Sequence, residues 1–401
     1  MKTLAALACL ALAAHPALAQ EDSTAVEPDT AYVIYTDRPL TLPLGIGFRI
    51  PSYDRVNGLT LPWGPNLSLG DGRVDLDALV SYRSHLGNWD PSIEGSFRPG
   101  YNNEVELYVG RGTFTNDSWI RSDLINSGAA IFVGTDARNY YRADRASLRF
   151  TRALTGRAFT FTPFLGGNIE KDWSTGSLRP TSRPWSVFGR SDTLKMLRAN
   201  PAVVKGNLGS VLAGTGMDYF RGEVDAKLSA TVEHAFRSPV ERCVFAPGGG
   251  PCTIGKGSFT QGTIHAEVFF PTFGTQTFSF RGHTVLSGDT VPPQRYAYLG
   301  GSATLPTVDL LALGGDRLFY AEGEYMIPID RIMLRMLGSP FLALRYAVGS
   351  AGVRDLPPFI QNLGIGAGIS FLRVDYNIDP AGDRSPFSER SAFSFGVSIP
   401  R

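Results

Sequence analysis

The sequence is poor in cysteine, in charge of one sign and in long apolar runs. Its 401 residues include 3 cysteines, too few for a disulfide scaffold. Lys and Arg total 38 against 37 Asp and Glu, so no global field attracts nucleic acid or an anionic membrane surface. No apolar run beyond the N-terminus is long enough for a membrane-spanning helix. A mean hydropathy of −0.04 excludes a helical multi-span transporter.

The N-terminus has the pattern of a secretory signal peptide. An apolar run extends from Leu4 to Ala14, and small residues stand at Ala17 and Ala19 before Gln20. The run is too short to cross a hydrocarbon core of roughly 30 Å, which disfavours a membrane anchor. The five apolar residues before Cys9 are too few for a lipoprotein signal. We therefore expect cleavage between Ala19 and Gln20 and a mature chain outside the cytoplasm.

Alternation of apolar and polar residues is the main structural signal. From Glu223 to Glu233 every even position is apolar and every odd position is polar. Successive side chains of a strand point to opposite faces, so this segment predicts a strand with one apolar and one charged face. Strands of about 8–11 residues, the length that crosses a bilayer when tilted, are expected along the chain. The same alternation recurs at residues 73–80, 104–109, 145–151, 264–268, 342–348, 372–378 and 393–399.

Two folds can carry this alternation. In a soluble sandwich the apolar faces meet in a core, whereas in an outer-membrane barrel they face lipid and the polar faces line the lumen. A sandwich of this length would need several domains, yet the sequence has no linker, no composition break and no ~100-residue repeat. We therefore predict an all-β fold, a single transmembrane antiparallel β-barrel of about 16 strands, in the outer membrane of a diderm bacterium.

The predicted organisation has three parts: a signal peptide (1–19), a short acidic periplasmic tail (20–40) and the outer-membrane β-barrel domain (41–401). The only clear helix start, from Ser191 to Pro201, predicts either a loop helix at the barrel mouth or a plug in the lumen. Aromatic residues near the ends of apolar stretches are expected to form girdles at the membrane interfaces: Tyr101, Tyr108, Trp119, Tyr219, Phe220, Tyr296, Tyr298, Phe319 and Tyr320.

A set of motifs stands in order along residues 45–401. Tyr53–Leu59 precedes the first strands, Pro292–Gly301 leads into a long loop, Ala321–Ile329 follows, and Gly364–Tyr376 and Ser394–Ile399 come last. Together they resemble the bacterial surface-antigen superfamily of barrels, which includes the outer-membrane barrel-assembly insertase and the two-partner-secretion transporters. The resemblance implies transport or assembly of a partner polypeptide across or into the outer membrane. A passive diffusion pore for small solutes is the alternative.

The sixth-loop motif of that superfamily is altered here. An Arg-Gly-aromatic tip follows the Gly-Gly pair in the family, and its Arg contacts an acid on the barrel wall. Here Pro306 stands at the Arg position, and proline has neither a charge nor a backbone N–H to offer the lumen-facing acids Glu322 and Glu324. We therefore expect that the isolated chain does not accelerate the insertion of another barrel protein. The altered motif comprises Gly300, Gly301, Leu305 and Pro306.

The sequence predicts no catalytic, cofactor or metal site, and hence no enzyme. No two histidines stand at metal-ligand spacing and no Gly-x-Ser-x-Gly motif occurs. His265 and Glu267 are expected to line the lumen, while Glu322 and Glu324 are expected to pair with an arginine such as Arg345.

Cys243 and Cys252 are expected to form a disulfide in an extracellular hairpin loop, because exported thiols at this spacing oxidise. The expected partners are the outer-membrane bilayer and a periplasmic or secreted polypeptide, with no nucleic acid, and the chain is expected to be a monomer.

The signal-peptide interpretation makes a direct prediction. Intact-mass and N-terminal peptide analysis of the protein from outer membranes should find Gln20 as the first residue, because the small residues before it fit the leader-peptidase site. A retained Met1, or a lipid on Cys9, would contradict export by this route.

Overall fold

The computed structural model describes residues 40–41, 46–70, 72–175, 198–243, 252–331, 339–369, 372–382 and 388–397. All of them belong to one compact unit, Pro39–Arg401. The expected signal peptide, nearly all of the acidic tail and residues 191–197 of the expected helix lie outside the described residues. No helix in the described part of the chain is long and apolar enough to cross a membrane.

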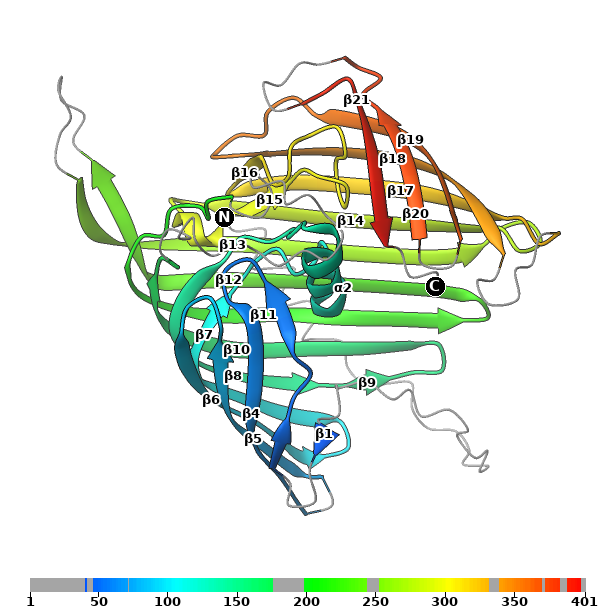
Figure 1. Cartoon of the computed structure of the whole chain (residues 1–401). Helices are drawn as coiled ribbons and strands as arrows, with labels where there is room; N and C mark the ends of the chain where they lie inside the picture. The colour runs from blue at the N-terminus through cyan, green and yellow to red at the C-terminus, as the bar shows by residue number, and fades with distance from the viewer. Residues whose placement is uncertain are drawn as a thin grey trace, which may run out of the picture. The chain divides into compact units, whose positions relative to one another are not determined.

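Antiparallel strands form one large sheet, which confirms the predicted all-β class (Figure 1). The short strands β15 (Ala297–Leu299) and β16 (Leu313–Gly315) form a separate pair. The large sheet contains β1 (Leu40–Thr41), β2 (Ile46–Phe48), β3 (Ser52–Asp54), β4 (Gly58–Leu69), β5 (Val74–Arg83), β6 (Asn88–Gly100), β7 (Asn103–Phe114), β8 (Tyr141–Arg152), β9 (Leu154–Thr155), β10 (Phe159–Trp173), β11 (Gly206–Arg221), β12 (Val224–Cys243), β13 (Cys252–Pro271), β14 (Thr277–Gly288), β17 (Arg317–Pro328), β18 (Pro340–Gly352), β19 (Ile360–Ile369), β20 (Leu372–Ile378) and β21 (Ser391–Val397).

Neighbours in sequence are neighbours in the sheet. The strands pair in chain order, with β14 followed by β17, and β2 and β3 both pair with β4. In the described part of the chain, residue-by-residue registers join β21 to β20 and β3 to β4, and none joins β21 to an N-terminal strand. Closure of the sheet and a count of about 16 strands therefore stay predictions.

The two ends of the sheet have different connections. At one end, here termed the turn end, connections such as 101–102 and 222–223 are short. At the opposite loop end, residues 115–140 link β7 to β8, and residues 289–316 link β14 to β17. Short turns on one side and long loops on the other are typical of outer-membrane barrels, where the long loops are extracellular.

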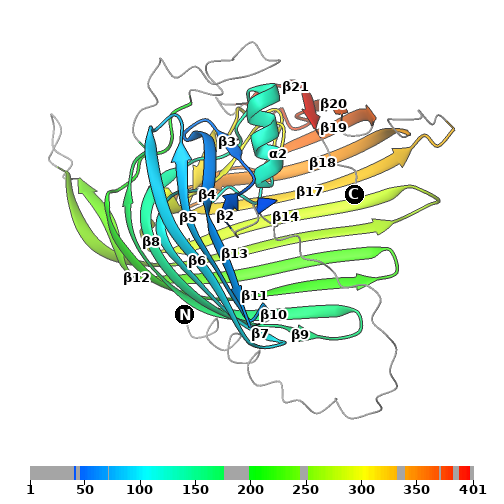
Figure 2. The same cartoon turned by 60° about the horizontal axis from the view of Figure 1, so that its bottom comes forward.

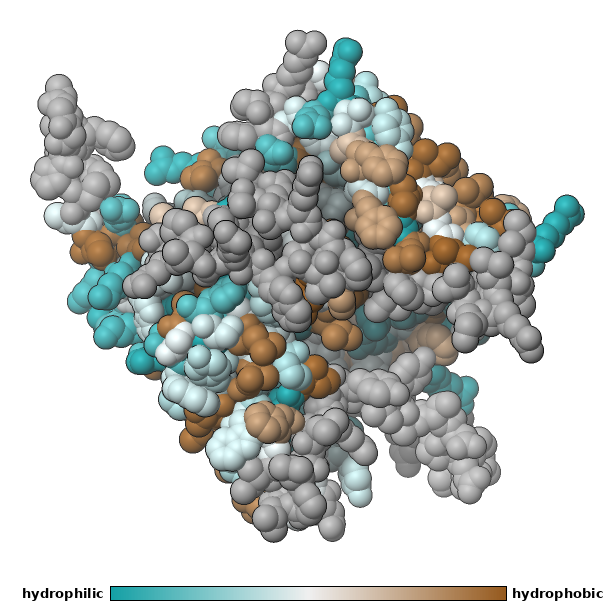
Figure 3. Space-filling model, viewed as in Figure 1, coloured by the Kyte–Doolittle hydropathy of each residue, from teal (hydrophilic) through white to brown (hydrophobic). Residues whose placement is uncertain are grey.

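The apolar face of the sheet points outward and the polar face points inward. On β18, Leu342, Leu344 and Tyr346 are 41–50% exposed, whereas Arg345 between them is 7% exposed. On β20 the exposed apolar residues likewise alternate with buried polar ones. Figure 3 shows apolar side chains gathered over the strands β18 to β21. A soluble sandwich would bury these faces against each other, so the arrangement favours a sheet surrounded by lipid.

Four of the expected girdle aromatics lie on the inner side instead. Tyr320 is 1% exposed, because it is on the inward face of β17. Trp119 stacks on His283 with ring centroids 4.1 Å apart. Tyr296 and Tyr298 pack against buried apolar clusters. The prediction was wrong for these residues because the loops that carry three of them fold into the concave side of the sheet.

The hairpin of β12 and β13 is longer than expected. Each strand has 20 residues, roughly twice what a tilted strand needs to cross a bilayer, and a bulge between Ala235 and Ser238 interrupts the register. Pairing therefore continues beyond the alternating segment. At its end Cys243 and Cys252 are direct backbone partners. Their side chains lie outside the described ones, and the disulfide stays a prediction.

Sequence reasoning missed a short helical segment. The helix α2 (Asp123–Gly128) continues into one turn of π-helix, η1 (Ala129–Val133). Ser122 caps α2 by accepting a hydrogen bond from the backbone N–H of Ile125, and Gly134 ends η1 at φ 73°. Figure 2 shows α2 beside β3. The Ser-Asp pair at the start was a usable capping signal, although a helix of 6 residues has little periodicity.

The sidedness of β12 can be tested by a matched pair of substitutions. Leu228 is 43% exposed on the outer face, whereas Lys227 lies opposite Glu267 on the inner face. An arginine facing lipid costs roughly 2–4 kcal/mol near the midplane and a lumen change costs little. Leu228→Arg should therefore lower folding into lipid vesicles, measured by gel mobility with and without heating, far more than Lys227→Leu. Equal effects would favour the sandwich, or a register shifted by one residue.

Candidate functional site

Residues 289–316, here termed the inner loop, turn back sharply at a pair of glycines. Gly300 and Gly301 have φ values of 125° and 87°, which other residues rarely adopt. The backbone N–H of Gly301 donates to the carbonyl oxygens of Leu305, at 3.1 Å, and Val308, at 2.9 Å. A Cβ atom on Gly300 would lie 2.0 Å from the carbonyl oxygen of Asp309. The Gly-Gly motif is therefore required for this turn.

The turn is held by a cluster of side chains on the inner face of the large sheet, which is termed the wall from here on. This cluster, here termed the clasp, consists of Arg281 on β14, Tyr320 and Glu322 on β17, and Arg345 on β18. Arg281 Nη2 lies 3.0 Å from Glu322 Oε2, and Arg345 Nη2 lies 2.7 Å from the same oxygen. The hydroxyl of Tyr320 also donates to it. One carboxylate thus neutralises only one of two guanidinium groups.

The inner loop supplies the remaining acceptors through its backbone. Arg345 donates to the carbonyl oxygens of Ser302, at 3.1 Å, and Thr304, at 2.8 Å. Arg281 donates to the carbonyl oxygen of Ala303 at 2.7 Å. Hydrogen bonds from a charged donor are stronger than neutral ones. On this side of the inner loop, therefore, the strands carry the arginines and the loop carries the acceptors.

Apolar packing supports the clasp. Leu305 is fully buried and packs with Leu299 and Val308 of the inner loop against Leu318 on β17 and Ile360 on β19. Pro306 of the altered Gly-Gly motif is followed by Thr307, whose N–H donates to Asn362 Oδ1 at 3.0 Å. The loop is therefore fixed to β14, β17, β18 and β19 on this side.

The other side of the inner loop carries an arginine that the sequence interpretation missed. Arg295 lies in the turn η2 (Pro293–Arg295) and is 6% exposed. Its guanidinium pairs with Glu170 on β10, and its Nε lies 3.5 Å from Glu233 on β12. Charge-assisted anchoring of this loop to wall acids therefore exists, but through Arg295 rather than at position 306. The inner loop spans the interior between two parts of the wall.

Three more segments fill the interior at the loop end. Arg55, in the turn between β3 and β4, is 2% exposed and donates to the carbonyl oxygens of Arg138, at 2.9 Å, and Arg198, at 2.6 Å. Gln294 of the inner loop donates to Asp172 Oδ2 at 3.0 Å and to the carbonyl oxygen of Val204 at 3.1 Å. These contacts join residues 53–57, 136–140, 198–204 and the inner loop into one polar assembly.

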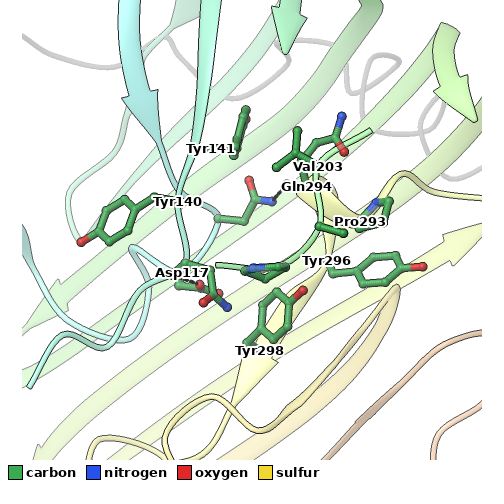
Figure 4. Close-up of a pocket in the computed structure, with 12 residues that line it drawn as sticks. Asp117, Tyr140, Tyr141, Val203, Pro293, Gln294, Tyr296 and Tyr298 are labelled. Carbon is green, nitrogen blue, oxygen red and sulfur yellow. Dashed lines mark hydrogen bonds between the residues drawn. The ribbon is translucent and has the colours of Figure 1, made fainter. Parts of the chain in front are cut away.

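A small cavity lies within this assembly, between Asp117, Tyr140, Gln294 and Tyr298 (Figure 4). Its volume of about 20 Å³ suits one water molecule, not an organic ligand. Asp117 is 1% exposed, and its Oδ2 accepts the N–H of Asn139 at 2.8 Å. Burial raises the pKa of Asp117 to about 7, against the opposing effect of that hydrogen bond and of Arg198, Arg138 and Arg55.

The turn-end half of the inner face is more open. Arg98 and Asp75, 2.8 Å apart, are 46% and 35% exposed, and Arg149 and Glu106 are 48% and 49% exposed. By contrast, Glu170 at the loop end is 0% exposed. The charged inner face is therefore accessible from the turn end and covered by loops at the other end.

The remaining predicted residues lie on the inner face. Glu324 pairs with Arg373 on β20 at 2.7 Å rather than with Arg345. His265 lies 3.5 Å from Glu267, beside Trp119 and His283. No group of three or more His, Cys, Asp or Glu side chains in the described ranges is placed to hold a metal ion.

Comparison with known proteins identifies no family. The sequence matches no protein-family model, and no curated protein matches it. Among solved structures it is similar to CdiB from Escherichia coli, with 12% identity over 88% of this chain and 62% of that one and a TM-score of 0.46. It is also similar to CdiB from Acinetobacter baumannii, with 11% identity over 86% of this chain and 58% of that one and a TM-score of 0.45. The siderophore receptor PirA from Pseudomonas aeruginosa has 10% identity over 86% of this chain and 76% of that one, with a TM-score of 0.28.

The chain spans about three fifths of the length of the two CdiB structures. All three TM-scores lie below 0.5, so the functional proposal for this chain rests on its own geometry.

The raised pKa of Asp117 predicts a pH dependence of the loop assembly. The protonated carboxyl suits the buried site, so its stabilising contribution is complete below the ordinary pKa of 3.8 and is lost as the pH rises through about 7. Hydrogen-exchange mass spectrometry should find the amides of residues 135–142 at least about tenfold less protected at pH 8.5 than at pH 5.5, after correction for intrinsic exchange. Asp117→Asn should remove this difference in protection, whereas equal protection of the wild type at both pH values would contradict the prediction.

Proposed function

We propose that the chain is an outer-membrane β-barrel that passes a partner polypeptide across or into the membrane, with the inner loop as its movable closure. Three parts support this: an apolar outer face, a charged inner face open from the turn end, and a loop end filled by chain segments. The single observation that carries the proposal is the clasp, in which wall arginines hold the backbone of the inner loop.

The clasp is suited to release because its contacts are polar. Arg281 and Arg345 bind carbonyl oxygens that water or another polypeptide can replace. The apolar contacts of Leu299, Leu305 and Val308 add stability to the closed state, so opening requires a partner or a change in the clasp. This is the behaviour expected of a gated passage.

The alternative is a passive diffusion pore, and the exposed ion pairs of the turn end favour it. Arg98–Asp75 and Arg149–Glu106 carry mixed charge, as the lumen of a general pore does. The two functions differ in the resting state. A passive pore conducts steadily without a partner, whereas a chain closed by the inner loop does not.

Single-channel recording in a planar bilayer tests the difference. The wild-type protein should be closed for most of the recording. Arg345→Met should open it more often, because the carbonyl oxygens of Ser302 and Thr304 lose their donor and Glu322 loses one of its two arginines. Breaking a buried pair in this way costs roughly 3–5 kcal/mol. The matched control is Arg98→Met, which removes two exposed pairs, with Asp75 and Glu104, each worth about 0–1 kcal/mol, and should leave the recording unchanged. Steady conductance of the wild type, unaffected by Arg345→Met, would support the passive pore.

Passage of a polypeptide is tested by photo-crosslinking in cells. Glu106 on the inner face and Leu107 on the outer face are adjacent on β7 and similarly exposed, at 49% and 43%. A photoreactive residue at 106 should capture a polypeptide in an extended state, and the same residue at 107 should capture lipid. Absence of polypeptide adducts at 106, in cells where the barrel is correctly inserted, would contradict the transport role.

A further inference from the structure

A hollow of about 890 Å³ lies on the outer face of β6 to β12, toward the loop end. The part of the hollow that lies farther from the loop end is apolar. Ile93, Val109, Ala146 and Ile169 are successive cross-strand partners from β6 to β10. On β11 the same row continues with Gly209, which has no side chain, and the ring of Phe236 lies over it. The absence of a side chain at Gly209 thus forms part of the hollow.

The upper part of the hollow is charged. Two residues further toward the loop end, on the same face of the sheet, a second row of successive cross-strand partners consists of Arg111, Asp144, Lys171 and Asn207. Arg237 lies opposite Gly209, because the bulge in β12 turns both Phe236 and Arg237 outward. The apolar row and the charged row are therefore adjacent, as the acyl and headgroup levels of a bilayer are.

The charged row has an excess of positive charge. Arg111 holds Asp144 through two hydrogen bonds, of 2.7 and 3.1 Å, and lies over the ring of Trp173 at 5.5 Å. Lys171 and Arg237 are both exposed at the rim of the same hollow. Arg111, Lys171 and Arg237 thus outnumber the one carboxylate of the charged row, Asp144, while Arg145 and Glu170, which also line the hollow, pair with each other. The hollow is complementary to an anionic group attached to an apolar body.

We infer that this hollow binds one phosphorylated lipid of the membrane's outer leaflet. Its acyl chains lie along Ile93, Val109, Ile169 and Phe236, and its phosphate lies between Lys171 and Arg237. The inference rests on the proposed function only in that this face of the sheet is in lipid. A peptide strand is a poorer occupant, because β7 to β11 already pair with neighbours on both sides and offer no free strand edge.

The test uses the full chain, purified in mild detergent, and lipid A bisphosphate as the probe, with dephosphorylated lipid A as its partner. Native mass spectrometry of the wild type should find one tightly bound lipid A bisphosphate and much weaker binding of the dephosphorylated form. Each cation near an anionic lipid contributes about fivefold in affinity. The Lys171→Gln/Arg237→Gln variant should therefore bind lipid A bisphosphate roughly 25-fold more weakly.

Two controls make the outcome specific. Lys227→Gln removes a cation from the inner face of β12 and should bind lipid A bisphosphate as the wild type does, and Lys171→Arg should retain binding because it keeps the charge. Equal binding of the two probes by the wild type, or no loss in the double variant, would overturn the inference. Failure of the lipid site leaves the channel recordings of wild type and Arg345→Met unchanged, whereas failure of the proposed function appears in those recordings while lipid binding persists.

Discussion

A sheet whose outer face is apolar must satisfy its polar groups on the inside. Because the outer face is apolar, the inner face of this chain carries the charges, and each charge needs a partner at the cost of its own desolvation. The interior is therefore organised by hydrogen bonds and ion pairs instead of by a large apolar core. Arg281, Glu322 and Arg345 at one side of the inner loop, and Glu170 with Arg295 at the other, are the points where this requirement is met.

This constraint explains why loops fill the interior at one end. An arginine pair that shares one carboxylate needs further acceptors, and backbone carbonyl oxygens of a folded-in loop provide them. Arg55 makes contacts of the same kind, to the carbonyl oxygens of residues 138 and 198. The loops and the strands thus depend on each other, and at the turn end, beside the short connections that the structure describes, the ion pairs Arg98–Asp75 and Arg149–Glu106 are open to solvent.

Much of the fold could be predicted from the sequence because strand alternation is a local property. The alternation of apolar and polar residues from 223 to 233 shows which side chains share a face of the strand. The structure places Leu228 outside and Lys227 inside, as expected. The contacts of the inner loop could not be read in the same way. The acceptors at Ser302, Ala303 and Thr304 are carbonyl oxygens, which every residue has, and Arg295 finds Glu170 across 125 residues of chain. The pair of Glu322 with Arg345 on the neighbouring strand was expected from the sequence and is confirmed, and Arg281, which stands opposite Glu322 in register, was accessible to the same reasoning about strand pairs.

The clasp recognises a peptide backbone and no particular side chain. Three carbonyl oxygens in succession receive the donors of Arg281 and Arg345, and another polypeptide in a turned conformation presents equivalent oxygens. In the proposed transport role, a chain that displaces the inner loop meets the same donors that the loop has left. Arg281 and Arg345 would then bind the partner polypeptide as they bind the inner loop, without discriminating between sequences. Selection of the correct partner would have to occur before it reaches the lumen.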